Sequence, residues 1–460
     1  MKLTMLSHAS VLIEEGAVAI CADPWFFGEA FNESWSLLCD PAMTSTGLQG
    51  VRYIWISHEH PDHLHYPTLK AIPSEQKAKI TLLYQEHFSS RMYRALSNLG
   101  FRAVVELPLS RWYDLENEVS VLCCSAGTID SLLAVRSRGG TVLNMNDCVL
   151  SREAATVVSK WIGPVDVLLT QFSIAGWVGN PTDTDVVERH MVIERMQNYI
   201  NAFRPRAVIP FASFVYFSHH ENRYMNKWVN TPDYVCEQLK GAQSTVQFLY
   251  NGDSWSSEDG FTSNGDSLER YRRDFSTISD RSFISHPSFP LEEILDLGKK
   301  LVNNVRAAFP NILLKLAAPL HFYVVDLGTA IRFDLSRGVV GIDQRSKKNC
   351  DLALGSQALW YAFKFPWGFG TLDVSGRYEV LNPQLNRKAM YLCHLYGTDI
   401  SFKGVFRRLR QGRVWKFLWS KRHEILDRLI KGGQGVYYQS GSQSEKINNR
   451  NDKGEQAPVR

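Results

Sequence analysis

Residues 58–63 form the sequence His-Glu-His-Pro-Asp-His, which constrains this chain more than any other segment. The apolar residues 51–57 come directly before it and predict a buried strand that leads into the cluster. Imidazole nitrogens and carboxylate oxygens bind zinc, iron and manganese, so the cluster does not choose among these metals. Because three histidines and an aspartate within six residues have few other uses, the segment predicts a metal centre at the end of a strand.

The first half of the chain has the pattern of a layered α/β domain, which we place at residues 1–250. Short β-branched runs come first in pairs and then alternate with helical stretches. The expected strands are residues 10–14, 17–21, 51–57, 80–84, 103–107, 119–124, 132–136, 141–144, 165–170 and 207–211. The expected helices are residues 88–99, a segment capped at Ser151, and residues 186–203.

The second half predicts a smaller domain after a polar stretch. Residues 251–290 are rich in serine and acidic residues and are expected to be a linker or an excursion. Residues 291–402 begin with a helical pattern and continue with strand-like runs at residues 322–326 and 371–378, which predicts an α+β domain.

The C-terminal segment, residues 403–431, is strongly basic. It contains ten Lys or Arg residues against Glu424 and Asp427, interleaved with aromatic residues. Such a segment either contacts an anionic membrane surface or partner, or packs as a solvated terminal helix, and the sequence leaves both open. The polar residues 432–460 are expected to be disordered.

The overall composition excludes several classes of protein. The 51 basic and 47 acidic residues leave a net charge of +4, which gives no reason to expect a nucleic-acid partner. The eight cysteines form no C-x-x-C pair and indicate reduced thiols in a cytoplasmic protein. No signal peptide and no run of about 18 apolar residues are present, so we expect a soluble or at most peripheral protein.

The metal-binding cluster, placed after a buried strand, resembles the signature of the metallo-β-lactamase superfamily. That resemblance implies an αββα sandwich, followed here by the smaller α+β C-terminal domain. A narrower resemblance, to the metallo-β-lactamase-like part of the CMP-N-acetylneuraminate hydroxylases, rests on short matches. These are Leu12-Ile13-Glu14, Asp23-Pro24-Trp25, Ile56-Ser57-His58, Asp62-His63-Leu64, Tyr66-Pro67-Thr68-Leu69-Lys70 and Pro210-Phe211-Ala212. Those hydroxylases carry an N-terminal Rieske iron–sulfur domain, and this chain contains no cysteine–histidine pattern for such a cluster.

The superfamily resemblance implies two metal positions that share an aspartate. The residues that match its ligands are His58, His60, Asp62, His63, Asp147 and His219. His58 and His60 would serve the first metal, and Asp62, His63 and His219 the second, with His220 as the alternative to His219. Asp147 would bridge both metals, or else serves only as a turn residue. The resemblance makes Asp62 and Asp147 the candidate catalytic residues, which would orient an attacking water.

One ligand of the superfamily pattern is missing. A third histidine of the first metal is expected near residues 125–130, and none is there. Asp130, a cysteine of the Cys123-Cys124 pair or a water would replace it. We therefore expect one firmly held and one labile metal ion.

Further residues flank the predicted centre. His8 and Asp23 are expected to support the ligands from behind or to have core or turn roles. Residues 171–173, with Gly176 and Trp177, follow a buried strand at the same end of the sheet, where they line the substrate pocket or pack in the core.

Two activities and one binding role fit these features. The first is hydrolysis by a metal-activated water, on a sugar, nucleotide-sugar or glycan substrate, with one or two divalent metals, zinc or iron. The second, implied by the narrower resemblance, is iron-dependent hydroxylation of an amino-sugar, which requires a separate electron-transfer protein. The third is a binding protein that keeps the fold without catalysis.

Overall fold

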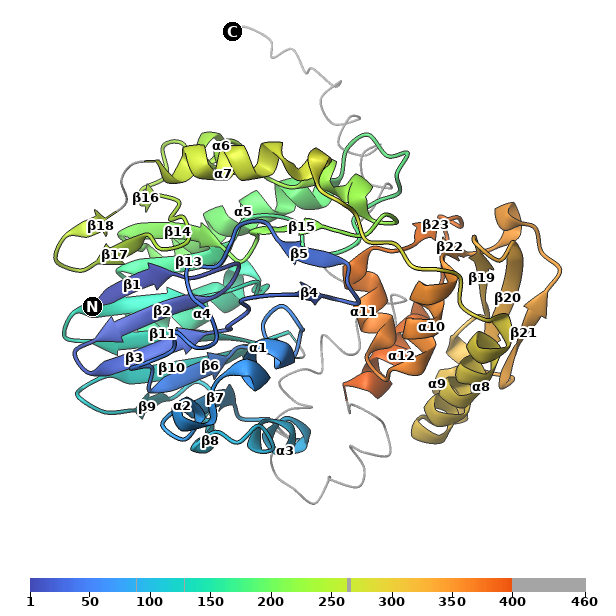
Figure 1. Cartoon of the computed structure of the whole chain (residues 1–460), viewed down its shortest axis with the longest axis horizontal. Helices are drawn as coiled ribbons and strands as arrows, with labels where there is room; N and C mark the ends of the chain where they lie inside the picture. Colours follow the sequence, from blue (N-terminus) through green and yellow to red (C-terminus); the bar gives the residue numbers. More distant parts are fainter. Residues whose placement is uncertain (88, 128, 263–265, 399–460) are drawn as a thin grey trace, which may run out of the picture.

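Two domains lie side by side in the computed structural model, which describes residues 1–398 except 88, 128 and 263–265 (Figure 1). In the first domain, two large sheets face each other and helices cover their outer faces. In the second, helices pack beside a smaller sheet. The predicted αββα sandwich followed by an α+β domain is confirmed.

The first sheet of the sandwich holds eight strands among the described residues. Their order is β18 (Gly260–Thr262), β17 (Ser254–Ser256), β1 (Lys2–Met5), β2 (Val11–Glu15), β3 (Val18–Ala22), β6 (Tyr53–Ile56), β7 (Thr81–Gln85) and β8 (Ala103–Leu107). Helices α1 (Tyr66–Ala71) and α3 (Arg91–Ser97) bury Leu69 and Leu96 against its outer face. The segment predicted as a linker thus begins with two strands of this sheet, because β17 pairs with β1.

The second sheet holds seven described strands. Their order is β16 (Thr245–Val246), β14 (Ala207–Phe211), β13 (Val167–Gln171), β12 (Gly140–Asn144), β11 (Asp130–Ser137), β10 (Ser120–Ala126) and β9 (Trp112–Asp114). Helices α4 (Arg152–Ile162) and α5 (Val187–Phe203) pack on its outer face. Ser151 caps α4 as predicted, since its side chain accepts a hydrogen bond from the Ala154 backbone N–H.

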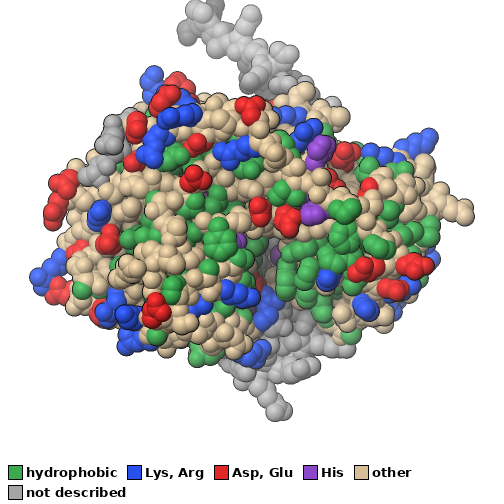
Figure 2. Space-filling model, viewed as in Figure 1, with side chains coloured by type: hydrophobic (Ala, Val, Ile, Leu, Met, Phe, Trp, Pro, Cys, Tyr) green, Lys and Arg blue, Asp and Glu red, His purple; other side chains and the backbone are tan. Residues whose placement is uncertain are grey.

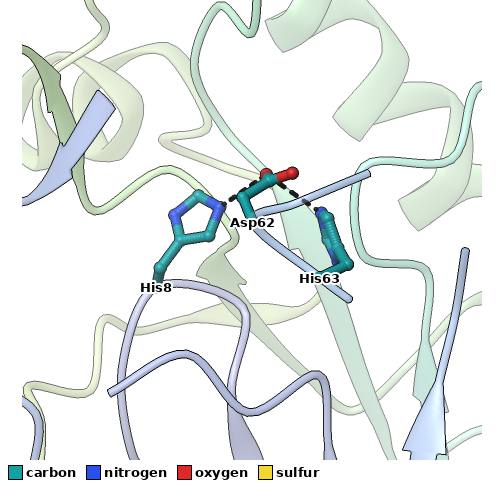
Figure 3. A group of neighbouring side chains, drawn as sticks. All are labelled: His8, Asp62 and His63. Carbon is teal, nitrogen blue, oxygen red and sulfur yellow. Dashed lines mark hydrogen bonds and ion pairs between the residues drawn. The ribbon is translucent and has the colours of Figure 1, made fainter. Parts of the chain in front are cut away.

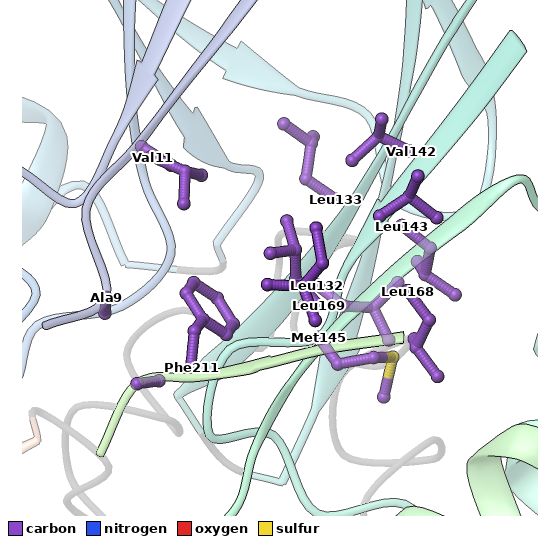
Figure 4. Packing of buried hydrophobic residues seen from close by; sticks show 14 of the residues in the cluster. Ala9, Val11, Leu132, Leu133, Val142, Leu143, Met145, Leu168, Leu169 and Phe211 are labelled. Atoms are coloured by element: carbon purple, nitrogen blue, oxygen red, sulfur yellow. The ribbon is translucent and has the colours of Figure 1, made fainter. Parts of the chain in front are cut away.

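The core of the sandwich lies between the two sheets. Val11 faces Leu133 and Phe211 across this space (Figure 4), and none of the three is more than 1% exposed. Strands β13 and β14 are buried along their whole length, as is typical of parallel strands covered on both faces. This rigid interior fixes the strand ends from which the candidate site is built.

The second domain contains a five-stranded sheet in the described part of the chain. Its order is β21 (Val339–Asp343), β20 (Thr329–Asp334), β19 (Leu320–Val324), β22 (Leu352–Leu354) and β23 (Glu379–Val380). The domain also contains helices α8 (Leu291–Ala308), α9 (Asn311–Leu316), α10 (Ser356–Lys364), α11 (Gly368–Ser375) and α12 (Lys388–Gly397). The strand predicted at residues 371–378 is wrong, since most of that segment belongs to α11. Packing of α11 against α10 and α12 overrides its β-branched composition.

Polar and apolar contacts fix the two domains against each other. The fully buried Arg377 donates from Nε to Glu221 Oε2 at 2.6 Å, and Asn32 and Gln357 exchange side-chain hydrogen bonds. One apolar cluster joins Trp35 of the first domain to residues of the second. No helix in the described residues has the length and apolar character to cross a membrane. The predictions for residues 403–431 and 432–460 lie outside the described residues.

Candidate metal centre

The metal-binding cluster lies where the strands of both sheets end. Its side chains are His58, His60, Asp62 and His63 from the loop after β6, His8 from the bend between β1 and β2, Asp130 at the start of β11, and Asp147 after β12. Strand β6 is buried apart from its first residue, so the loop begins deep inside the sandwich. His58, Asp62 and His63 are accordingly at most 3% exposed.

The first group of potential ligands consists of His58, His60 and Asp130. Their ligand atoms all lie within 4.8 Å of one another. His58 Nε2 lies 2.9 Å from His60 Nδ1 and 3.9 Å from Asp130 Oδ1. The superfamily pattern expects a third histidine near residues 125–130, and in the structure Asp130 lies beside the other two ligands. Cys123 and Cys124, the other predicted replacements, are buried in the core.

The second group consists of His8, Asp62 and His63 (Figure 3). Asp62 Oδ2 lies 3.3 Å from His8 Nε2 and 3.3 Å from His63 Nε2, so one carboxylate oxygen faces two imidazoles. The superfamily pattern predicts His219 at this position. The structure brings His8 there, from the opposite end of the domain's sequence.

Asp147 lies between these two groups. Its Oδ2 is 3.7 Å from His58 Nε2 and 3.6 Å from His63 Nε2, and these three residues form the remaining group in the described chain. A carboxylate that faces one histidine from each group could contact ions held by both. Asp147 was predicted for that role on the sequence resemblance.

Asp23 orients His63 from behind. The Asp23 Oδ2 atom accepts hydrogen bonds from His63 Nδ1 at 2.8 Å and from the Ser57 hydroxyl at 2.6 Å, and Oδ1 accepts from the Ser57 backbone N–H. Because Asp23 holds Nδ1, the Nε2 atom of His63 is the one that faces Asp62 and Asp147, and it is the ring nitrogen that could bind a metal. Metal-binding histidines are commonly held by a carboxylate in this way.

Burial and charge prepare the cluster for a cation. Burial lowers the pKa of His58 and of His60 to about 4, so both imidazoles are neutral at pH 7. Burial alone would raise the pKa of Asp62, but His63 and His8 hold it well below its usual value. Burial alone would lower the pKa of His63, but Asp62, Asp147 and Asp23 raise it well above its usual value, so a cation would have to displace a proton from this ring. His58 and His60 already have the neutral form that metal ligands require.

Several buried ligand atoms have no hydrogen-bond partner among the described residues. They are Oδ1 of Asp62, Nε2 of His63 and Oδ1 of Asp147. Buried polar atoms are rarely left unsatisfied, and three in one cluster of imidazoles and carboxylates fit one or two divalent cations. The donor set therefore suits the metals that the sequence predicts.

His219 lies apart from the three ligand groups. Its ring stacks on His286 with centroids 5.4 Å apart, and its Nδ1 lies 3.4 Å from Glu221 Oε2. Its Nε2 atom is buried without a hydrogen-bond partner in the described structure, and burial lowers the pKa of the ring to about 3. A ligand role for His219 or His220 stays a prediction.

A cavity of about 390 Å³ opens beside the cluster. Its metal-facing wall includes His60, Asp62, Asp130 and Asp147. The opposite wall comes from α5, α11 and α12, and Figure 2 shows the surface hollowed between the two domains. The cavity is lined by Gln171, Ser173, Gly176 and Trp177, which is the pocket-lining role predicted for this segment. Phe172 has the other predicted role and packs in the core.

Some cavity residues carry no sequence signal. Glu188 and Arg195 on α5, and Arg387 and His394 near the end of the described chain, also line this space. Glu188 and Arg195 stand two helical turns apart, a spacing that would place them on one face of a predicted helix. Nothing in the sequence directs that face toward the metal centre.

The comparisons with known proteins agree with this architecture. Residues 2–212 match the family model of the beta-lactamase superfamily domain. The cytidine monophosphate-N-acetylneuraminic acid hydroxylase of Mus musculus is 26% identical over 240 residues, and the match covers 49% of this chain but only 41% of the mouse protein. The first domain thus has the metallo-β-lactamase fold, and its resemblance to those hydroxylases is confirmed.

Solved structures of two activities are also similar to this chain. A diiron β-hydroxylase from Streptomyces venezuelae is 15% identical, with 55% of this chain and 54% of that chain covered and a TM-score of 0.39. An isothiocyanate hydrolase from Delia radicum gut bacteria is 13% identical, with 56% and 100% covered and a TM-score of 0.42.

Proposed function

We propose that this chain is an iron-dependent oxygenase that hydroxylates an amino-sugar, free or linked to a nucleotide. The observation that carries the proposal is the composition of the ligand groups, each of which contains two histidines and one aspartate. Sets of two histidines and one carboxylate are typical of non-haem iron oxygenases. The curated relatives named as hydroxylases match about half of this chain, which supports the same activity.

We assign the ligands from the geometry of the cluster. His58, His60 and Asp130 would hold one ion, and the second group would hold the other. Both groups have the same donor types, so we propose two ions of similar affinity in place of the firm and labile pair expected from the sequence. Asp147 would contact both ions.

The reaction sets requirements on the rest of the protein. Iron bound at this centre would supply the redox chemistry that couples O₂ to a C–H bond. R–H, O₂, two electrons and two protons give R–OH and water, so a separate reductant protein must deliver the two electrons. The cavity would position the C–H bond beside the cluster, and its apolar residues, among them Trp35 and Ile129, would limit the access of water.

Hydrolysis is the second candidate function. It is favoured by the isolated buried oxygens of Asp62 and Asp147, which can orient a water molecule beside a metal. In that case Asp130 would replace a histidine without changing the metal from zinc. The same sugar-sized substrates would enter the cavity.

The identity of the metal and the product distinguish the two functions. Protein purified without added metal should contain about two iron ions per chain. With CMP-N-acetylneuraminic acid, O₂ and a chemically reduced ferredoxin, it should give a product heavier by one oxygen atom. Zinc, together with hydrolysis under anaerobic conditions, would exclude the oxygenase. A metal-free chain whose thermal stability does not respond to iron, zinc or chelators would favour the third role, a binding protein.

A matched variant tests the observation itself. Asp130→His restores the three-histidine set of the superfamily pattern and keeps the other ligands. We expect this variant to retain more zinc and to lose hydroxylation. An Asp130→His protein that still binds iron and hydroxylates at the original rate would contradict the role given to Asp130.

A further inference from the structure

Helix α5 presents charged residues to the cavity on one face. Glu188 and Arg195 both line the cavity and stand seven residues apart, which is two turns or roughly 10 Å along a helix axis. Neither residue belongs to the ligand groups. Their charges are opposite, and Glu194, the neighbour of Arg195, lines the cavity as well.

Glu188 is a buried carboxylate that no basic side chain of the described residues pairs with. The residue is 6% exposed and lies in the first turn of α5, where its carboxyl accepts a hydrogen bond from its own backbone N–H, but its Oε1 accepts none. Burial raises the pKa of its carboxyl to about 7. A buried carboxylate that lacks hydrogen bonds lowers the stability of the folded protein. Such a carboxylate beside a cavity therefore indicates a side chain that is kept because it binds a ligand.

Arg195 lies at the metal-facing side of the same helix. Its Nη2 donates to Gln171 Oε1 at 2.9 Å, and the Gln171 backbone N–H in turn donates to Asn146 O, next to Asp147. No carboxylate in the described structure lies within ion-pair distance of Arg195. Its remaining N–H donors are therefore available to an anionic group of a molecule in the cavity.

We propose that Glu188 is a specificity-determining residue, which accepts hydrogen bonds from a hydroxyl or ammonium group of the substrate while Arg195 binds its acidic group. The substrate class is thus a small anion that also carries a hydroxyl or ammonium group, which reaches Glu188 while the anionic group reaches Arg195. This inference deepens the proposed function, because it concerns the same cavity. It requires no particular reaction at the metals.

The first test uses stability, which needs no ligand. Glu188→Gln and Glu188→Met should each raise Tm by roughly 2 °C at pH 8, where a carboxyl with a pKa of about 7 is mostly ionised, because they remove a buried charge that no basic side chain compensates. Glu153→Gln is the matched control, since Glu153 lies in the first turn of α4 but is exposed and outside the cavity. A decrease of Tm in both Glu188 variants would show a structural role and overturn the proposal.

The second test measures binding to zinc-loaded protein by calorimetry. The probes are glucosamine 6-phosphate, glucose 6-phosphate and 2-deoxyglucose 6-phosphate, which share a phosphate and differ in the group at one carbon. The wild type should bind the deoxy compound about tenfold more weakly than the amine. Glu188→Gln should abolish this ranking, and Arg195→Gln should weaken all three probes about tenfold while keeping it.

The outcomes separate this inference from the proposed function. Zinc-loaded protein does not use O₂, and product analysis of the calorimetry samples shows whether a probe was hydrolysed, so binding is measured separately from either reaction. An unchanged ranking in Glu188→Gln, or no binding of any probe, would refute the inference even if hydroxylation is observed.

Discussion

The two walls of the cavity are built in different ways. The metal-facing wall combines His60 and Asp62 of one six-residue loop with Asp130 and Asp147 beside neighbouring strands, and hydrogen bonds to Asp23 help to orient the loop. The opposite wall combines α5 of the first domain with α11 and α12 of the second, and its charged groups are far apart in the sequence. The region matched by the family model ends at residue 212, before α11 and α12. The difference leads us to propose that the first wall carries the chemistry and the second selects the substrate.

The largest expected effect is loss of the ligand shared by both metals. Asp147→Ala should remove most bound metal and lower kcat/KM by roughly 10³-fold or more, because its carboxylate faces a histidine of each group. Elemental analysis and turnover measure the two effects. His190→Ala, an exposed histidine on α5 that does not line the cavity, is the control. An Asp147→Ala protein with full metal content would show that this wall does not depend on a bridging group.

A smaller and more selective effect distinguishes His8 from His219. His8→Ala should weaken binding of one metal about 100-fold and leave the other, whereas His219→Ala should retain both. Metal titration of the two purified variants in parallel measures this. The reverse result would mean that His219 is a metal ligand, as the sequence predicts, and that His8 is not. The metal-facing wall would then include the loop after β15 (Val215–Phe217).

Asp23→Asn tests the support behind the ligands. The amide cannot supply the negative charge that holds the Nδ1 proton of His63, so metal affinity should fall by roughly 10-fold to 100-fold. Competition with a chromophoric chelator gives the affinity, and a thermal melt checks that the fold is kept. Affinity equal to that of the wild type would mean that the six-residue loop orients its histidines without help.

The contrast between the walls also explains what the sequence could predict. The strand before His58 and the spacing of its loop are local patterns, and they led to the fold and to most of the cluster. The sequence predicts for His8 either a supporting role or a core or turn role, because nothing local shows that the bend after β1 meets the loop after β6. The role of Glu188 depends on which face of α5 turns toward the cavity, and tertiary packing alone decides this.

The smallest expected effect concerns the second domain. Arg387 lies beside α12, forms an ion pair with Asp373 at 3.3 Å and lies over the Trp177 ring at 5.3 Å from its centroid. All three residues line the cavity, so Arg387 helps to form the wall opposite the metal centre. In the sequence it lies far from the six-residue loop of the metal-binding cluster. Arg387→Gln should raise KM about threefold to tenfold and leave kcat and metal content unchanged, because it removes binding that the ground state and the transition state share. Steady-state kinetics and metal analysis on the same preparation measure this. A decrease in kcat at constant KM would instead place the second domain within the chemistry, and the division of roles between the two walls would be wrong.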